Sequence, residues 1–202
     1  MPYSINIDTA ATSYPVTTAE AKAHCRVDVS DDDTLIDRLI SVATTLAEVA
    51  TDRTFISTTY TLKLSGWPAG DSVKLPRAPL QSVTSVTYYD VDDASQTLAG
   101  SVYDTDTASE PGLIFQKINQ AWPDLSARKW PVEIVYIGGQ TSAANVPDGI
   151  KQAMLLAIGH WYIHREQVGR MTYDVKFAWD TLIAAASYGG GNISYDPAEV
   201  SY

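Results

Sequence analysis

Two segments with helical periodicity enclose a middle region whose residue pattern is that of β-strands. In the first segment, residues 15–53, apolar side chains recur at three- and four-residue spacing from Leu35 to Ala50, which predicts one face of an amphipathic helix. In the second segment, Pro147 suits the first turn of a helix, and apolar spacing continues to about Gln167. Helical ends around a β-rich middle predict one helical core that carries a β insertion.

Start and stop signals divide the helical segments into about four helices. Thr17 and Glu20 form a capping-box pattern, and the acidic run 31–33 stands where a helix N-terminus favours negative charge; an acidic interaction patch is the alternative for that run. Gly159 permits the close approach of another helix, and the glycines from Gly189 end the last helix. The expected helices run from the Thr17 cap to about Cys25, from the acidic run at 31–33 to near Arg53, from Pro147 to about Gln167, and from about Val175 to about residue 187.

The middle region is expected to form short strands, because β-branched and aromatic residues alternate there with polar ones. Residues 90–95 read as a polar turn, and residues 1–14 as an irregular segment. The expected strands cover residues 55–64, 83–89, 113–118 and 132–137. The fold class is therefore α+β: a helical core of about four helices, an inserted and mostly antiparallel β region, and an extended C-terminal tail. We expect one domain, with N-terminal helices at 15–53, the β-rich insertion at 54–145, C-terminal helices at 146–187 and the tail at 188–202.

Composition excludes several classes of function. The formal net charge is −10, so general attraction to nucleic acid is not expected, because such binding depends on lysine and arginine neutralising phosphates. Cys25 is the one cysteine, which excludes a disulfide within the chain. No apolar run approaches the roughly 18 residues of a membrane span, and the N-terminus lacks the pattern of a secretory signal. A soluble protein of cytoplasmic origin, without membrane contact, is expected.

Three places carry reactive side chains, and each has a structural interpretation. His160 and His164 are four residues apart, as in metalloprotease helices, but a tryptophan stands where such a helix has its general base. Residues 90–95 begin like a calcium loop but lack its glycine, which favours a solvated turn. Cys25 has a histidine neighbour, yet adjacent helical residues point in different directions, so a buried structural cysteine is expected. We expect no catalytic residue, no metal site and no cofactor, and keep a metal-dependent hydrolase using His160 and His164 as an alternative.

The C-terminal tail is the candidate docking element. Its apolar and aromatic residues follow a strand-like pattern beyond the glycines, and such an arm can add a strand to a neighbouring protein; terminal disorder is the alternative. The candidate docking residues are Tyr188, Ile193, Tyr195, Val200 and Tyr202.

The order of residues along the chain resembles the head–tail connector (adaptor) proteins of tailed bacteriophages and gene transfer agents. The resemblance spans roughly residues 14–185. It rests on an ordered set of short matches, each unspecific alone: Pro15-Val16-Thr17, Glu20-Ala21-Lys22, Arg26-Val27-Asp28, Asp32-Asp33, Leu35-Ile36, the stretch 43–53, Leu75-Pro76, Pro79, Val83, Ser85-Val86, Tyr88, Trp122-Pro123, the strand end at 135–138, Val146-Pro147, Ile150-Lys151, Ala153 and His164-Arg165-Glu166.

The resemblance implies a structural protein of the virion and not an enzyme. Connectors form a ring of about a dozen subunits beneath the portal, extend the DNA channel, and provide the platform for tail attachment. The implied partners are further copies of the chain, the portal protein, and a tail-completion (stopper) or tail terminator protein. DNA passes through the channel without sequence-specific binding. The implied location is the head–tail interface of the virion, after assembly in the host cytoplasm. A general peptide- or glycan-binding module remains a further alternative.

Overall fold

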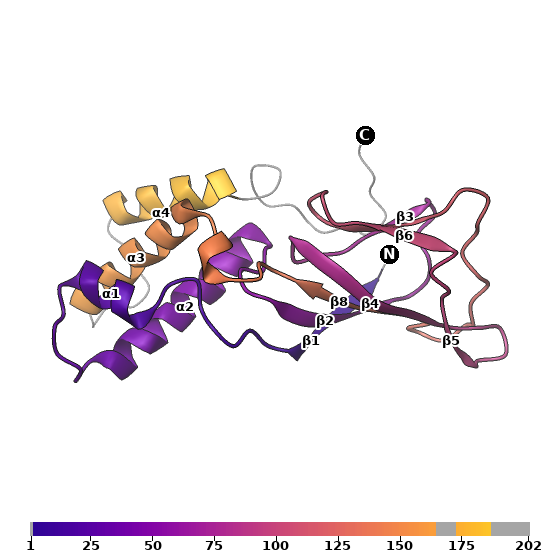
Figure 1. Ribbon diagram of the computed structural model, residues 1–202, viewed down its shortest axis with the longest axis horizontal. Helices are drawn as coiled ribbons and strands as arrows, with labels where there is room; N and C mark the ends of the chain where they lie inside the picture. Colours follow the sequence, from indigo (N-terminus) through magenta and orange to yellow (C-terminus); the bar gives the residue numbers. More distant parts are fainter. Residues whose placement is uncertain (1, 165–172, 187–202) are drawn as a thin grey trace. The chain divides into compact units, whose positions relative to one another are not determined.

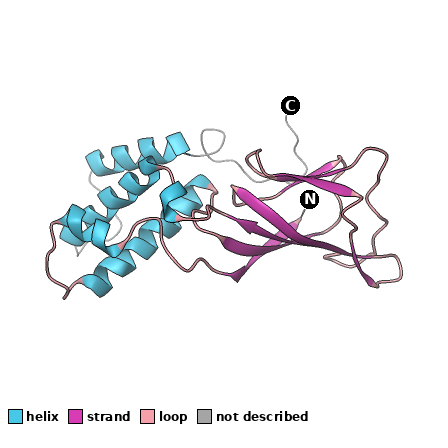
Figure 2. Ribbon diagram, in the orientation of Figure 1, coloured by secondary structure: helices cyan, strands magenta, loops and turns pink. Residues whose placement is uncertain are grey.

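The protein, seen as a computed structural model that describes residues 2–164 and 173–186, divides into two compact units (Figure 1). The β unit contains residues 2–10 and 57–139, and the helical unit contains the other described residues. Figure 2 shows helices confined to one unit and strands to the other. The predicted α+β class is confirmed. None of the helices in the described part combines the length and apolar character that crossing a bilayer requires.

The helical unit contains four α-helices among its described residues, as predicted. They are α1 (Thr18–Cys25), α2 (Asp33–Thr51), α3 (Asp148–Ile163) and α4 (Tyr173–Ala186), with a 3-10 turn at Ala143–Asn145. The expected continuation of α3 to Gln167 falls partly outside the described residues, as does the tail.

Helix α1 begins at the predicted capping box. The Thr17 backbone N–H donates to Glu20 Oε2 over 2.7 Å, and the Glu20 backbone N–H donates to Thr17 Oγ1 over 3.2 Å. Each side chain therefore satisfies a backbone donor that the first helical turn leaves without a partner. The helix ends at Arg26, whose φ of 57° is left-handed.

Helix α2 begins inside the acidic run, and that run also ties neighbouring helices together. Asp33 is its first residue and forms a 2.6 Å ion pair with Lys22 of α1. Asp32 accepts a 2.5 Å hydrogen bond from the Tyr162 hydroxyl of α3. The prediction that a helix starts at the acidic run is confirmed, and the side chains of Asp32 and Asp33 are engaged within the fold.

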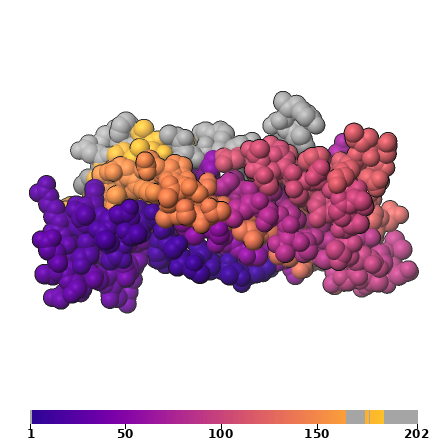
Figure 3. Space-filling view, viewed as in Figure 1, coloured from indigo at the N-terminus to yellow at the C-terminus, as the bar shows by residue number. Residues whose placement is uncertain are grey.

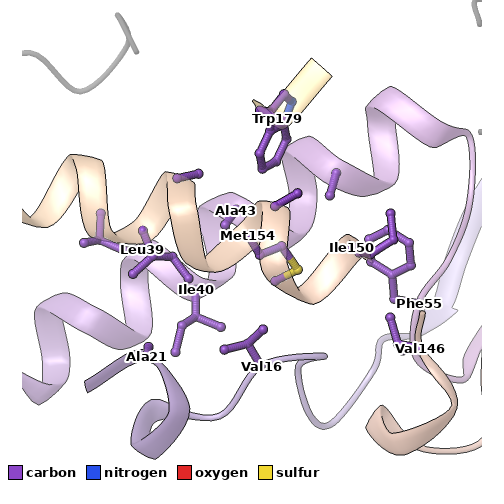
Figure 4. Close-up of a cluster of buried hydrophobic side chains, with 14 of the residues drawn as sticks. Val16, Ala21, Leu39, Ile40, Ala43, Phe55, Val146, Ile150, Met154 and Trp179 are labelled. Carbon is purple, nitrogen blue, oxygen red and sulfur yellow. The ribbon is translucent and has the colours of Figure 1, made fainter. Parts of the chain in front are cut away.

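The helical core forms where α3 contacts each of the other three helices. Met154, Ile158 and Ile150 of α3 are fully buried, and Figure 4 shows labelled side chains of α2, α3 and α4 gathered between the helices. Gly159 allows the close approach that was predicted: a Cβ built there would lie 3.1 Å from Cδ2 of His24 on α1. The apolar stripes of these helices therefore bury one another.

The β unit contains a five-stranded and a three-stranded sheet, and all of their strand pairs are antiparallel. The strands are β1 (Tyr3–Thr9), β2 (Thr58–Leu64), β3 (Ser72–Lys74), β4 (Leu80–Tyr89), β5 (Ser95–Thr97), β6 (Tyr103–Asp106), β7 (Leu113–Gln116) and β8 (Val132–Gly138). The larger sheet has the order β1-β2-β8-β4-β5 and the smaller one β3-β7-β6. The four predicted strands correspond to β2, β4, β7 and β8, with ends that differ by a few residues.

Strand β1 corrects the prediction for the N-terminus. Residues 1–14 were expected to be irregular, but Tyr3–Thr9 pairs with β2, with Ile5 opposite Leu62. The strand exists because β2, more than 50 residues later, supplies its hydrogen-bond partners. This partner could not be identified from the local pattern alone.

One apolar cluster joins both sheets of the β unit. Val73 of β3 and Ile114 of β7 are fully buried with Leu62 and Ile134 of the larger sheet. The buried Tyr136 hydroxyl donates a 2.7 Å hydrogen bond to the Pro76 carbonyl, so its polar end is satisfied inside the core.

Candidate functional site

The two histidines that could have held a metal lie stacked on each other. His160 is buried and His164 exposed, and their ring centroids are 4.5 Å apart with planes 24° apart. Nδ1 of His164 lies 3.1 Å from the backbone carbonyl oxygen of His160. Because imidazole lone pairs lie in the ring plane, nearly parallel rings do not direct two nitrogens at one ion. Within residues 2–164 and 173–186, no three histidine, cysteine or acidic side chains gather as metal ligands do.

The turn at residues 90–95 uses its first carboxylate to organise its own backbone. Asp90 Oδ1 accepts from the backbone N–H of Asp92 (3.1 Å) and of Ala94 (2.9 Å), and Oδ2 accepts from Gln96 Nε2 (2.8 Å). The hydrogen bond from Gln96, followed by those from the backbone, lowers the pKa of Asp90. The predicted polar turn is confirmed, and both carboxylate oxygens of Asp90 accept hydrogen bonds from N–H groups of the turn and of Gln96.

Cys25 is half-buried and packs against the helical core. Burial raises the pKa of its thiol, which keeps the sulfur protonated, whereas a nucleophilic cysteine needs a lowered pKa. The neighbouring His24 ring lies against Gly159 of α3. The expectation of a structural cysteine therefore holds, although the side chain is not fully buried.

An uncharged strip on the exposed face of α2 is the clearest candidate for binding another protein. Val42, Leu46 and Val49 are 43%, 45% and 66% exposed, although Leu46 was predicted to face the core. Thr45 and Ala50 are the other exposed residues between positions 42 and 50. We call these five residues the α2 strip. In the view of Figure 3, residues of α1 and α2 form part of the surface of the helical unit.

Local hydrogen bonding makes the α2 strip less polar than its composition indicates. The Thr45 hydroxyl donates to the Ser41 carbonyl over 3.0 Å, so the side chain has satisfied its donor within the helix. Glu48 is half-buried and accepts a 2.9 Å hydrogen bond from the Phe55 backbone N–H. A contiguous group of exposed apolar side chains on a chain of net charge −10 is a candidate binding surface.

The α2 strip shows where the sequence prediction of the helix face was too wide. Leu46 and Ala50 follow the apolar spacing but are exposed, while Thr44 and Thr51 are buried and donate to the carbonyls of Ile40 and Ala47. A threonine that bonds its own helix can be buried without an unsatisfied hydroxyl. Val42 and Val49 were not singled out from the sequence; they lie at three- and four-residue spacing from Leu46, which was the available signal.

The five predicted docking residues of the tail, Tyr188, Ile193, Tyr195, Val200 and Tyr202, lie outside the described residues. Within the described residues, the α2 strip is the candidate surface for association, and His160, His164, Asp90 and Cys25 make contacts inside the fold. This combination is typical of a protein that works by binding other proteins.

Comparison with known families agrees with that class. The model of the phage gp6-like head-tail connector protein family matches residues 16–120, slightly more than half of the 202-residue chain. The chain belongs to the gp6-like head-tail connector family. The resemblance seen in the ordered residues is confirmed, and the protein is a structural connector of the head–tail interface.

Solved structures share the fold across nearly the whole chain. A chain from the virion of a native gene transfer agent particle has a TM-score of 0.74 and 22% identity, covering 91% of this chain and 94% of that one. A chain from the neck of an empty particle with C6 symmetry has a TM-score of 0.74 and 22% identity, covering 94% and 100%. A chain from the neck of a native particle with C12 symmetry has a TM-score of 0.71 and 23% identity, with the same coverage. No curated protein matches the chain.

Proposed function

We propose that the protein assembles into a closed ring of about a dozen copies beneath the portal of a phage or gene transfer agent particle. The observation that carries the proposal is membership of the connector family over residues 16–120. The shared fold with chains from particle necks of C6 and C12 symmetry supports a rotational arrangement. In that position the ring extends the DNA channel and presents a platform to a tail-completion or tail terminator protein.

The α2 strip is our candidate for the contact between neighbouring copies. A ring that closes by rotation requires heterologous contacts, in which one patch meets a different patch on the next copy. Val42, Leu46 and Val49 offer one such patch, because apolar area at an interface contributes stability when it leaves water. Glu48 is the one charged residue between positions 42 and 50, and its hydrogen bond from the Phe55 backbone N–H lowers the cost of covering it at an interface.

The acidity of the chain suits a protein through which DNA passes. With a net charge of −10, repulsion of phosphates keeps DNA moving and unbound. We therefore propose contact with DNA without sequence-specific binding.

The C-terminal tail completes the proposed function as a docking arm. We propose that Tyr188, Ile193, Tyr195, Val200 and Tyr202 contact a neighbouring protein of the neck, with the portal, another connector copy and a tail protein as the candidates. We further propose that the chain works as a single connector domain without enzymatic activity. The stacked geometry of His160 and His164 supports the second point.

Electron microscopy of the purified protein, alone and with its portal, tests the proposal. The expected result is a closed ring in solution or on the portal, with one rotational symmetry axis. A protein that stays monomeric even with the portal present would contradict it. Elemental analysis of the same sample is expected to find no stoichiometric zinc, iron or manganese, and a bound metal would reopen the hydrolase alternative.

A further inference from the structure

The larger sheet has a face that does not contribute to the core of the β unit. The smaller sheet and the shared apolar cluster lie on one side of it (Figure 1). Along β8, the third of its five strands, buried residues alternate with half-buried ones. Successive side chains of a strand point to opposite faces, so the half-buried Glu133, Val135 and Ile137 point away from the cluster. We call this side of the sheet the outer face.

The strand register identifies the residues that flank β8 on the outer face. Residues directly opposite each other on neighbouring strands have their side chains on the same face. Most of the flanking side chains are short and carry a hydroxyl group, so they surround Val135 and Ile137 without rising far above them. The rows across the sheet contain Ser4, Lys63, Glu133 and Thr87 in the first, Asn6, Thr61, Val135 and Ser85 in the second, and Thr59, Ile137 and Ser82 in the third.

The charges of the outer face nearly balance. Lys63 Nζ lies 3.0 Å from Glu133 Oε2, so the two charged residues of the rows neutralise each other. Asp8, near the end of the edge strand β1, accepts a hydrogen bond from the Thr61 hydroxyl. The face therefore carries one positive and two negative side chains on a chain whose net charge is −10.

Nearly neutral faces are the places where two copies of an acidic chain can meet. Each copy has a net charge of −10, and like charges oppose contact between acidic surfaces. The five residues of the α2 strip are uncharged, and Glu48 beside them accepts a hydrogen bond from the Phe55 backbone N–H. We infer that the outer face receives the α2 strip of the neighbouring copy, which rests on the proposed ring. The contact joins two different patches, as a ring that closes by rotation requires.

The two patches also agree in size and form. From residue 42 to residue 50 the α2 strip is about 12 Å long, and the outer face extends about 14 Å along β8 from residue 133 to residue 137. A helix with an apolar stripe packs on the face of a sheet in layered folds. In the inferred contact, the apolar side chains of the α2 strip cover Val135 and Ile137, and the apolar area of both patches leaves water.

Cross-linking in assembled rings tests the contact. In a Cys25→Ala background, one tagged copy carries Leu46→Cys and a differently tagged copy carries Val135→Cys, and the two are assembled together on the portal. A short bismaleimide joins the thiols, because it tolerates an offset that a disulfide, with Cβ atoms about 3.8 Å apart, does not. We expect a link between the two tags at about ten times the yield of the control, because docking gives the thiols a high effective concentration.

The control replaces Val135→Cys with Val91→Cys. Val91 is 67% exposed and lies in the turn between β4 and β5, so its thiol is more accessible than one at the half-buried Val135. Equal or higher yields from Val91 in intact rings would overturn the inference and leave the connector function standing. A link confined to one chain would overturn it in the same way. Absence of rings even in the wild type would overturn the proposed function and the inference together.

A second measurement uses charge and does not depend on thiols. Ser85, opposite Val135 on the outer face, is replaced by glutamate, and Ser85→Glu alone should raise the concentration at which rings form. Combined with Leu46→Lys, it should give rings at roughly one tenth of the concentration that the two separate losses predict, because opposite charges then meet across the contact. Ser85→Glu with Gln152→Lys is the matched control, since it has the same charges with the lysine on α3. Equal compensation in both pairs, or additive losses in the first, would contradict the inference.

Discussion

Replacement of Leu46 by lysine is expected to weaken ring assembly while leaving the helical unit folded. Leu46 stands in the middle of the α2 strip and is 45% exposed, so its outer part makes few contacts within the chain. A lysine there keeps good helix propensity. The change therefore acts on the contact between copies that we propose for this strip.

The magnitude follows from the exposed area that the contact would bury. Burying a whole leucine or valine side chain contributes about 1.5–3 kcal/mol, so the exposed 45% of Leu46 corresponds to about 1 kcal/mol. Desolvation of the lysine charge raises the loss to about 1–3 kcal/mol per contact. Such a loss weakens each contact by roughly 5- to 150-fold, and every contact in the ring carries it.

The assay compares the concentration at which rings form for the wild type, Leu46→Lys and Gln152→Lys. Gln152 is exposed on α3, so it receives the same charge outside the α2 strip. Each variant has a net charge of −9, because one positive charge is added to −10; reduced self-repulsion alone would favour assembly. Urea unfolding checks that the helical unit is intact.

Three results would refute the reasoning. Rings that form at the wild-type concentration despite Leu46→Lys would remove the α2 strip from the interface. An equal loss in Gln152→Lys would show that the effect comes from charge in general. A fall in unfolding stability of Leu46→Lys beyond a few tenths of a kcal/mol, the range of ordinary surface substitutions, would show that the side chain serves the fold.

Three further predictions concern the fold. Gly138→Ala should destabilise the β unit by about 1–3 kcal/mol in urea unfolding, because a Cβ there would lie 2.7 Å from the Arg77 carbonyl oxygen. The control Gly70→Ala should cost little, because a Cβ at Gly70 would have no atom within 4 Å. Equal effects of the two substitutions would contradict the packing argument. Thr17→Ala should cost about 1 kcal/mol by removing the α1 cap, and an unchanged unfolding midpoint would count against that cap. The hydrogen bond from the Thr17 backbone N–H lowers the pKa of the Glu20 carboxyl. The ionised Glu20 therefore contributes fully to stability above its unfolded pKa of about 4.3, and this contribution is lost as the pH falls through the folded pKa. Glu20→Gln should flatten that pH dependence, and an unchanged slope would show that other carboxylates cause it.

Local features of both units were predictable from the sequence because their partners are close in the chain. The α1 cap joins Thr17 to Glu20, three residues away, and the start of α2 depends on the acidic run beside it. The polar turn at residues 90–95 is likewise closed by Asp90 itself. For such features the sequence contains both the donor and the acceptor within one turn of chain.

The candidate site was less predictable, because exposure depends on which elements cover a side chain. Leu46 and Ala50 obey the apolar spacing of α2, and Thr44 does not, yet Thr44 is the one buried. Spacing gives the direction of a stripe but not its width, since the width depends on where α1, α3 and α4 pack. The histidine pair shows the same limit: helical spacing placed His160 and His164 together, and only the ring planes showed that they stack.

By itself, the sequence determined the α+β class, the four helices, the main strands and membership of the connector family, because these follow from periodicity, caps and residue order. Tertiary structure alone decided that Tyr3–Thr9 is an edge strand and that the α2 strip faces solvent. The physical reason is the same in both cases. A strand needs a hydrogen-bond partner, and the partner of β1 is β2, which lies more than 50 residues further along the chain. An apolar helix face is buried only where another element covers it, and no described element covers the α2 strip.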